Sequence, residues 1–520
     1  DNDTPYTRGE DSGQNQWTWQ HYNATVGYDG TFGRHVVSAS AGILYNIYKT
    51  DFSQNGAAGK MVEYRHMTVN GAVNYAYDDR YVATFSFAAD GSDNYRPGNR
   101  WGFYPSLGLG WIVSRERFLR DSRTVDLLKL RASVGKNGWD PMGEMRYLWE
   151  GYYTGRGGLN TGNSEHTWHG GTALSYLPNP GIFAEKSLKY DAGIDLRLWN
   201  RLSLNVDLFL EKRSGIVTQD WMIPGASGVD NPPYRNIGRM TNKGFEVQLS
   251  WADRIGDFNY ALTGMASYNS NKVDYMAEVV TVPTAARTGR RLDALFGYVA
   301  DGFYDWDDFD VGGELREGLP KPTFGAVQPG DIKYKNLNGD TVIDENDQTA
   351  IGDSYLPKLQ YSFSLAASYK GFDLFALFQG AAGRDVNLLD APLQNIAFRD
   401  NGNVYGIAEG RWAYYPEQGI DTRATATYPR LSLQDNSNNY RNSTLWKRSG
   451  DFLKLRNVEL GYTFAQPSLS KAGISKIRIY LSGVNLLTVS RLMRDYDIDP
   501  EILSGHPALK SYNLGLTVTF

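Results

Sequence analysis

The amino-acid sequence is dominated by a two-residue alternation of apolar and polar side chains over long segments. Between 188 and 198, one face of an extended strand carries only apolar side chains, and the other carries polar side chains and a glycine. The segment 202–211 repeats the pattern, with leucine and valine opposite Ser203, Asn205 and Asp207. A strand that crosses a bilayer needs about 9–11 residues, whereas strands of soluble sandwiches are usually nearer five or six. The sequence therefore predicts an all-β chain that forms a transmembrane antiparallel β-barrel.

The same alternation identifies about fifteen strands along the chain. They are expected at 16–29, 33–46, 61–77, 80–90, 101–113, 126–137, 187–198, 202–212, 236–251, 257–270, 357–369, 372–380, 451–464, 475–488 and 509–520.

The connections between these strands alternate in length. The short turns are expected at Asp29-Gly30, Asp78-Asp79, Asn200-Arg201, Asp253 to Gly256 and Lys370-Gly371, with longer ones at 114–125 and 465–474. The long connections are 138–186, 213–235, 271–356, 381–450 and 489–508. Bacterial outer-membrane barrels have short periplasmic turns and long extracellular loops, so we expect the long connections to be extracellular.

The number of strands bears on how much of a barrel the chain contains. Fifteen is odd, whereas bacterial single-chain barrels have an even number of strands. If the intact barrel is of the plugged class with about 22 strands, then about seven strands and the plug are absent from residues 1–520. We therefore expect the C-terminal part of a barrel, interrupted at an extracellular loop. A truncation or an incompletely identified polypeptide would explain the same start.

Composition excludes several other classes of protein. The 520 residues include no cysteine, which removes disulfides, zinc–thiolate sites and cysteine nucleophiles. The formal net charge of -5 argues against nucleic acid as a partner. No stretch approaches the 18 or so apolar residues of a membrane-spanning helix. A hydrophobic content of 41 % is too high for a disordered chain.

Short motifs follow one another along the whole chain. The first are 88–92 (AADGS), 98–106 (GNRWGFYPS), 128–133 (LKLRAS) and 242–246 (NKGFE). The next are 329–334 (PGDIKY), 338–340 (NGD), 351–352 (IG), 371–374 (GFDL) and 378–380 (FQG). The last are 484–488 (VNLLT), 499–501 (DPE) and the terminal Phe520. This ordered set resembles the SusC/RagA-type TonB-dependent transporters of the Gram-negative outer membrane.

The resemblance implies import of a sizeable nutrient, an oligosaccharide or in some members a peptide. The barrel would lie in membrane lipid, would be capped by a SusD-like surface lipoprotein and would be energised by TonB. The plug, its TonB box and the N-terminal strands of such a transporter are not found in this sequence. We therefore expect those parts as partners of the chain, and we expect no enzymatic activity.

One stretch fits a twelve-residue calcium loop. Its candidate oxygen ligands are Asn336, Asn338, Asp340, Asp344 and Asp347, together with the carbonyl of Val342. The departures from the usual loop are asparagine in place of the first acid, Thr341 in place of glycine, and aspartate in place of the last glutamate. Calcium is the expected ion, and magnesium fits less well. An Asn/Asp-rich turn without metal is the alternative.

Aromatic side chains in the long connections are candidates for contacts with a ligand or with the lid protein. Sugars and peptides both pack on such rings. The candidates are Trp149, Tyr152, Tyr153, Trp168, Trp412, Tyr414 and Tyr415. Packing within the loops and the aromatic girdles of a barrel would also account for them.

Catalytic patterns are weak in this sequence. The acidic run from Asp305 to Asp310 is typical of a solvated loop rather than of a glycosidase pair. His166 and His169 lack the further ligands of a zinc site. A soluble, secreted β-protein that binds or hydrolyses glycans remains the alternative function, since it would share the alternation and the loop aromatics.

Overall fold

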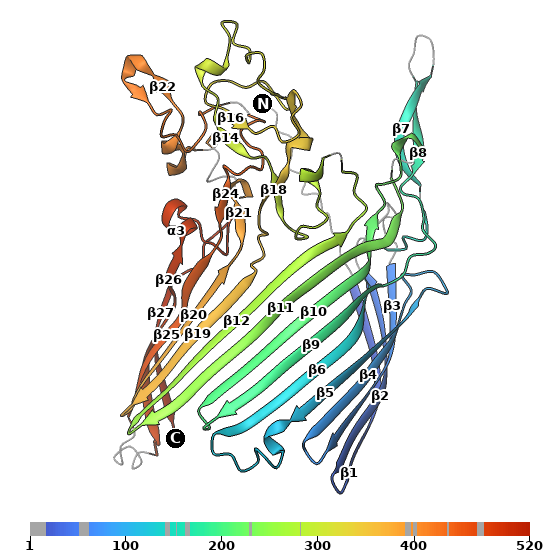
Figure 1. Ribbon diagram of the computed structural model, residues 1–520, viewed down its shortest axis with the longest axis vertical. Coiled ribbons are helices and arrows are strands. Elements are labelled where there is room, and N and C mark those ends of the chain that lie inside the picture. Colours follow the sequence, from blue (N-terminus) through green and yellow to red (C-terminus); the bar gives the residue numbers. More distant parts are fainter. Residues whose placement is uncertain are drawn as a thin grey trace, which may run out of the picture. The chain divides into compact units, whose positions relative to one another are not determined.

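The computed structural model describes residues 17–50, 62–140, 146–151, 153–161, 167–227, 231–280, 282–390, 397–398, 403–433, 436–464 and 473–520. Fifteen strands form one sheet in the order β1-β2-β3-β4-β5-β6-β9-β10-β11-β12-β19-β20-β25-β26-β27 (Figure 1). Each sheet strand therefore neighbours the sheet strands before and after it in the chain. All fifteen predicted strands are confirmed.

The strands of the sheet are generally longer than predicted. Their bounds are β1 Trp17–Phe32, β2 His35–Thr50, β3 Val62–Tyr77, β4 Tyr81–Ser92, β5 Trp101–Ile112, β6 Val125–Trp139, β9 Glu185–Leu198, β10 Leu202–Gln219, β11 Tyr234–Ile255, β12 Phe258–Tyr275, β19 Leu359–Tyr369, β20 Phe372–Ala382, β25 Phe452–Phe464, β26 Lys476–Ser490 and β27 Ser511–Thr519.

In the described parts of the long connections, the structure has small strands and the short helix α3. These elements are β7 Tyr153–Thr161, β8 Thr167–Leu174, β13 Leu295–Gly297, β14 Ala300–Phe303, β15 Lys321–Pro322, β16 Ile332–Tyr334, β17 Val342–Ile343, β18 Thr349–Gly352, β21 Asp385–Asn387, β22 Tyr414–Tyr415, β23 Ile420–Asp421, β24 Lys447–Ser449 and α3 Arg491–Tyr496. Among the described residues, no helix is long and apolar enough to cross a membrane.

The chain divides into two compact units. The first comprises 1–111, 131–190 and 211–239, and the second comprises 112–130, 191–210 and 240–520. In the first unit, β1 and β2 pair without interruption from Trp17 opposite Thr50 to Phe32 opposite His35.

That register corrects the first predicted turn. Asp29 and Gly30 lie inside β1, and the reversal occurs at Gly33, whose φ of 62° suits glycine. The strand continues because Asp29 and Gly30 face Ser38 and Val37 in the ladder. Likewise β11 continues through Asp253 to Ile255 and turns at Gly256, with φ 61°. The Asp-Gly dipeptide favours a turn locally, but the pairing of the two long strands decides where the chain reverses.

Other short turns have the backbone that two-residue hairpins need, which is positive φ at both central residues. Asp78 and Asp79 have φ of 53° and 51°, and Lys370 and Gly371 have 47° and 90°, as predicted. The turn after β9 lies one residue earlier than predicted, since Trp199 and Asn200 have φ of 54° and 52°.

The C-terminal strands of the second unit have one apolar face and one polar face. Leu481 of β26 lies opposite Leu460 of β25 and Leu514 of β27. These three leucines are 57 %, 53 % and 79 % exposed. One residue further along, Ser482 lies between Glu459 and Asn513 on the other face. The period-two pattern has thus sorted these strands into a side suited to lipid and a side suited to water.

The hydrophobic cores lie in the connections rather than under the sheet. In the second unit, the largest core joins the connections after β12, β20 and β26, through residues such as Ile332, Ile343, Leu388, Trp446 and Leu492. The small strands of these connections gather at the ends of β12, β19 and β20 that lie away from the C-terminus (Figure 1). In the first unit, Tyr95, Leu148 and Ile182 form a separate core.

The apolar face leads to a test of membrane insertion. We expect Leu481→Arg to lower the free energy of unfolding in lipid vesicles by about 2–4 kcal/mol, because it places a charge on the lipid side of β26, between two paired strands. Ser482→Arg is the matched control, since it places the same charge on the polar face and should cost much less. Equilibrium denaturant titration of the intact protein measures both. Equal losses would contradict the assignment of faces.

Candidate functional site

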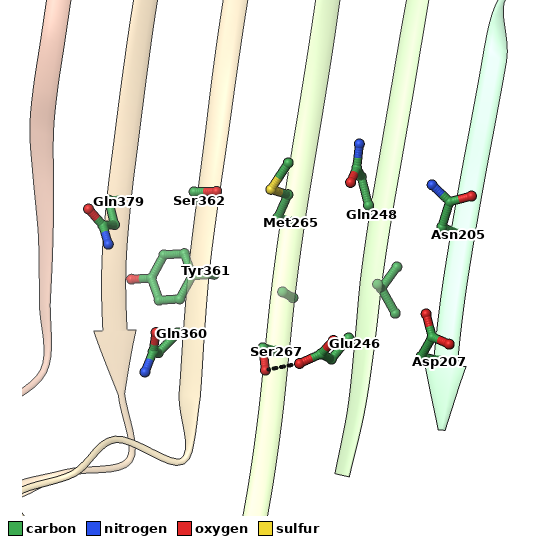
Figure 2. Close-up of a pocket in the computed structure, with 12 residues that line it drawn as sticks. Asn205, Asp207, Glu246, Gln248, Met265, Ser267, Gln360, Tyr361, Ser362 and Gln379 are labelled. Atoms are coloured by element: carbon green, nitrogen blue, oxygen red, sulfur yellow. Dashed lines mark hydrogen bonds between the residues drawn. The ribbon is translucent and has the colours of Figure 1, made fainter. Parts of the chain in front are cut away.

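The polar face of the second unit contains an open groove across β10, β11, β12, β19 and β20. Its volume is about 370 Å³. Figure 2 shows its polar side chains in two rows that cross neighbouring strands. The lining residues are Asn205, Asp207, Glu246, Val247, Gln248, Met265, Ala266, Ser267, Gln360, Tyr361, Ser362 and Gln379.

Strand register explains why these residues meet. Met265 lies opposite Ser362, which in turn lies opposite Gln379. Ser267 lies opposite Gln360 in the same way. Since alternate residues share a face, every second residue of each strand can reach the groove, and apart from Met265 those in these rows are polar. Ser267 Oγ also donates a hydrogen bond of 3.3 Å to Glu246 Oε1.

Two cations on β25, Lys454 and Arg456, neighbour the Gln379 side of the groove lining. Lys454 lies opposite Gln379 in the ladder. An irregularity between Leu455 and Asn457 gives Arg456 no partner in the register. The Arg456 Nε donates to Gln379 Oε1 at 2.8 Å, so this guanidinium is connected directly to the groove lining.

Both cations are paired with carboxylates from the connection between β26 and β27. Lys454 Nζ lies 2.8 Å from Asp499 Oδ1 and 2.7 Å from Glu501 Oε2, and Arg456 Nη2 donates to Glu501 Oε1. The side chains of Lys454 and Asp499 are only 1 % and 3 % exposed. The sequence motif 499–501 therefore supplies the counter-ions of β25.

Opposing effects set the pKa of these two acids. Burial raises the pKa of Asp499, but hydrogen bonds from Lys454 and from backbone N–H groups outweigh burial and keep it below its ordinary value. Burial also raises the pKa of Glu501, and hydrogen bonds from Arg456 and Lys454 again bring the net pKa below the ordinary value. Both carboxylates are thus held in the charged form that the cations require.

A second buried carboxylate joins two long connections. Asp331 is fully buried, and its Oδ1 accepts from Arg430 Nε at 2.7 Å and from the amides of Asn436 and Asn439 at 2.9 Å each. Nearby, Tyr334 donates its hydroxyl to the carbonyl of Asn438 at 2.7 Å. Burial raises the pKa of Tyr334, so the hydroxyl stays protonated. The motif 329–334 therefore anchors one connection to another.

The predicted calcium loop consists of two hydrogen-bonded parts. The side-chain oxygens of Asn336, Asn338 and Asp340 accept from the backbone N–H groups of Gly339, Asp340 and Val342, and the last two of these bonds form successive Asx turns. Asp344 and Asp347 cap a 3-10 turn at Glu345–Asp347.

Asp347 links the two parts, because it is fully buried and accepts from Leu337 N at 2.7 Å and from Asp344 N at 2.9 Å. No group of three or more His, Cys, Asp or Glu in the described residues is arranged to hold a metal ion. Calcium binding at this loop stays a prediction.

The predicted aromatic residues are divided between the two units. In the first unit, Trp149 packs against the core of Tyr95, Leu148 and Ile182, whereas Tyr153 and Trp168 are exposed on the β7–β8 hairpin. Tyr152 lies outside the described residues.

In the second unit, Trp412 is buried, Tyr414 lies under the guanidinium of Arg423 at 3.9 Å, and Tyr415 is exposed. Trp149 and Trp412 are thus packed within the loops, and a ligand or lid contact remains a prediction for the exposed ones.

The groove residues are absent from the sequence-based candidates. The sequence alone places Asn205 and Asp207 on the polar face of one strand. Which residues lie beside them depends on the register of β11, β12, β19 and β20. A search for polar residues at alternate positions of every predicted strand would have found them. Nothing in the sequence pairs Lys454 with Asp499, because 45 residues separate them.

The buried ion pair leads to a test of loop order. We expect Lys454→Met to lower the local stability of residues 491–510 by about 3–5 kcal/mol, because Asp499 is then buried without a counter-ion. Hydrogen exchange of the backbone amides in the intact protein measures this. Lys335→Met is the matched control, since Lys335 and Asp301 are half-exposed and should contribute less than about 1 kcal/mol. Unchanged exchange in both variants would contradict the role of the pair.

Comparison with known proteins identifies the family of the chain. A family profile described as "TonB dependent receptor-like, beta-barrel" matches residues 1–486. TonB-dependent receptor P26 of Formosa agariphila is 29 % identical, over 91 % of this chain and 48 % of the relative. TonB-dependent receptor SusC of Bacteroides thetaiotaomicron is 25 % identical, over 86 % of this chain and 43 % of the relative. The chain thus spans about half the length of the curated relatives it matches.

The fold is similar to that of solved transporters. A structure titled "Structure of the RagAB peptide transporter" superposes with a TM-score of 0.72 at 22 % identity, covering 97 % of this chain and 55 % of the other. The match of the family profile over most of the chain, together with the confirmed fifteen-stranded antiparallel sheet, leads to one conclusion: the chain belongs to the TonB-dependent receptor β-barrel family, with SusC- and RagA-like members as relatives.

Proposed function

We propose that this chain is the C-terminal part of the barrel of an outer-membrane importer for a sizeable nutrient, an oligosaccharide or a peptide. The observation that carries the proposal is the sheet with an apolar face along Leu460, Leu481 and Leu514 and a polar groove on β10 to β20. Its family consists of outer-membrane transporters of Gram-negative bacteria rather than enzymes. A barrel of the plugged, 22-stranded class is wide enough for a ligand larger than a single sugar or amino acid.

The edges of the sheet support the proposal that further strands belong to the same transporter. Among the strands that the structure describes, the sheet order ends at β1 and at β27. Backbone groups at an open edge have no water to pair with inside a bilayer, so a sheet is stable there only when closed. We propose that an N-terminal part with a plug and about seven strands closes it and connects it to TonB.

The long connections support the proposal of a lipoprotein partner. Three of them share one hydrophobic core, and the buried Asp331 joins two of these three, so that together they can form a packed docking surface. We propose that a SusD-like surface lipoprotein docks there. The similar structure named for RagAB is titled as a peptide transporter, which favours keeping peptide beside oligosaccharide as substrate.

A soluble glycan-binding protein or glycosidase is less well supported. Exposed leucines along neighbouring strands would be a liability in water. In the acidic run, Asp305 accepts from Trp306 N, while Asp308 accepts from Asp305 N and pairs with Lys333 at 3.0 Å. These two carboxylates therefore have structural partners rather than facing each other across a substrate.

The proposed function predicts membrane association and copurification. We expect the native protein to partition with the detergent-solubilised outer membrane and to migrate faster on a gel before heating than after. We also expect it to copurify with a fragment that carries a plug and with a SusD-like lipoprotein. Intact-mass measurement and N-terminal sequencing identify those partners. Free solubility without detergent, or copurification with neither partner, would overturn the proposal.

The calcium proposal has a test of its own. If Ca²⁺ bridges the oxygens of Asn338, Asp340 and Asp344, then chelation should increase hydrogen exchange at residues 336–347, and added Ca²⁺ should restore protection. Asp340→Ala should abolish the response, because it removes a central carboxylate. The same protection with and without the ion would show a turn held by its Asx hydrogen bonds alone.

A further inference from the structure

We infer that a pocket on the apolar face of the first unit binds the phosphate headgroup of a membrane lipid, and that Arg65 and Arg100 contact the phosphate. The pocket has a volume of about 330 Å³. Its lining residues are Tyr45, Arg65, Met67, Gly91, Ser92, Asp93, Arg100, Trp101, Tyr147 and Trp149. Nutrient import does not require such a site, and the inference rests on the proposed function only for the place of the chain in an outer membrane.

The pocket lies at the end of the apolar face of β5. Phe103 and Leu107 share one face of this strand and are 54 % and 44 % exposed. Trp101, the first residue of β5, lies on the same face and is 56 % exposed. The opposite face is polar, and Ser106 Oγ there forms a hydrogen bond of 2.7 Å with Ser86 Oγ. We therefore assign the face of Phe103 and Leu107 to lipid and place the pocket where β5 leaves the hydrocarbon.

One row of paired residues crosses the pocket. Gly91 of β4 lies opposite Trp101 on one side and Met67 of β3 on the other. Met67 in turn lies opposite Tyr45 of β2. Arg65 continues the same face of β3 two residues away. The lining thus passes from aromatic side chains, which mark the lipid interface of membrane barrels, to a cation.

The segment 146–149 forms a fixed wall of the pocket. Arg146 Nη2 donates to Asp93 Oδ1 at 2.9 Å. The N–H of Tyr147 donates to Asn94 Oδ1 at 2.9 Å. Tyr147 has a φ of 52°, a conformation that a non-glycine residue keeps only where its surroundings determine it. The wall is therefore part of the fold rather than the edge of a chance gap.

Acidic groups do not cancel the positive charge at the pocket. Glu63 pairs with both Arg65 and Lys49, so one carboxylate is shared by two cations. Asp93, the acid of the lining, pairs with Arg146 at 2.9 Å. These five side chains carry a net positive charge, which favours an anion at the pocket.

Two donors of the lining can bind a phosphate. Arg100 Nε donates to the carbonyl of Tyr95 at 3.0 Å, and no acidic group of the described residues pairs with its terminal nitrogens. Trp149 Nε1 is buried without a hydrogen-bond partner in the described part of the chain. Buried donors nearly always have a partner, and guanidinium groups bind phosphate through parallel hydrogen bonds. A phosphate in the pocket would supply acceptors to both donors.

The apolar surroundings favour a lipid over a soluble phosphate. Tyr45, Met67 and Trp101 line the pocket beside the cations, and the apolar face of β5 begins at the last of them. A free phosphate would gain nothing from these side chains, whereas acyl chains attached to the phosphate would cover them. The occupant that fits both parts of the pocket is a lipid with a phosphate headgroup.

Phosphatidic acid and diacylglycerol with identical acyl chains test the inference, because they differ only in the phosphate. The intact transporter is purified in detergent with the chains that accompany it, and native mass spectrometry measures the affinity of each lipid. We expect the wild type to bind phosphatidic acid about tenfold more tightly. The double variant Arg65→Gln, Arg100→Gln should bind the two lipids within about twofold of each other, because the phosphate has lost both guanidinium groups.

Arg34→Gln combined with Arg494→Gln is the matched control, because these arginines are 70 % and 71 % exposed, pair with acids and do not line the pocket. This control should keep the preference of the wild type. A preference that persists in the pocket variant, or that the control loses equally, overturns the lipid site. Displacement of phosphatidic acid by inorganic phosphate, but not by chloride of equal ionic strength, overturns the lipid in favour of a soluble anion.

The proposed function and the lipid site fail in different ways. Copurification with the plug fragment and the lipoprotein, without any preference for phosphatidic acid, overturns the site and leaves the importer. The expected lipid preference without either partner supports the site and overturns the importer. Free solubility without detergent overturns both.

Discussion

Backbone hydrogen bonding in a medium without water is the constraint on which the rest of this structure depends. Within hydrocarbon, every N–H and C=O of a spanning strand must find a partner on a neighbouring strand. The pairing of β1 with β2 is correspondingly unbroken over sixteen residues of each strand. In long paired strands, successive side chains point to opposite faces of the sheet. One face must therefore be apolar toward lipid, and the other can be polar toward water.

The polar side of the ladder gives the protein its chemistry. Side chains there need not pack a core, so amides, hydroxyls and acids can be placed at the register of the strands, as they are across β10 to β20. Charges that the sheet would leave exposed at the β25 end are instead covered by Asp499 and Glu501 from a connection. The connection between β26 and β27 thus has two effects. Its ion pairs hold the connection itself in place, and they neutralise the cations of β25.

The connections behave as small globular structures attached to the sheet ends. In the second unit, apolar residues of three connections meet in a common core, and Asp331 accepts hydrogen bonds from residues about a hundred positions away in sequence. A buried carboxylate with one arginine and two amides is costly to disturb, since removing any partner leaves the others unsatisfied. Such loops can present a fixed surface to a partner, which long unstructured loops would not do.

The sequence by itself determined the class of fold, the fifteen strands and the alternation of short and long connections, because strand periodicity and length are local properties of the chain. It misplaced the turn at Asp29-Gly30, since the signal of a turn is local whereas the end of a hairpin depends on how far two strands pair. Only the tertiary structure decided that Trp149 and Trp412 are packed, that Lys454 meets Asp499, and that Asp207, Glu246 and Gln379 share one groove. The physical reason is register: a side chain's face follows from its own strand, but its neighbours follow from the strands on either side.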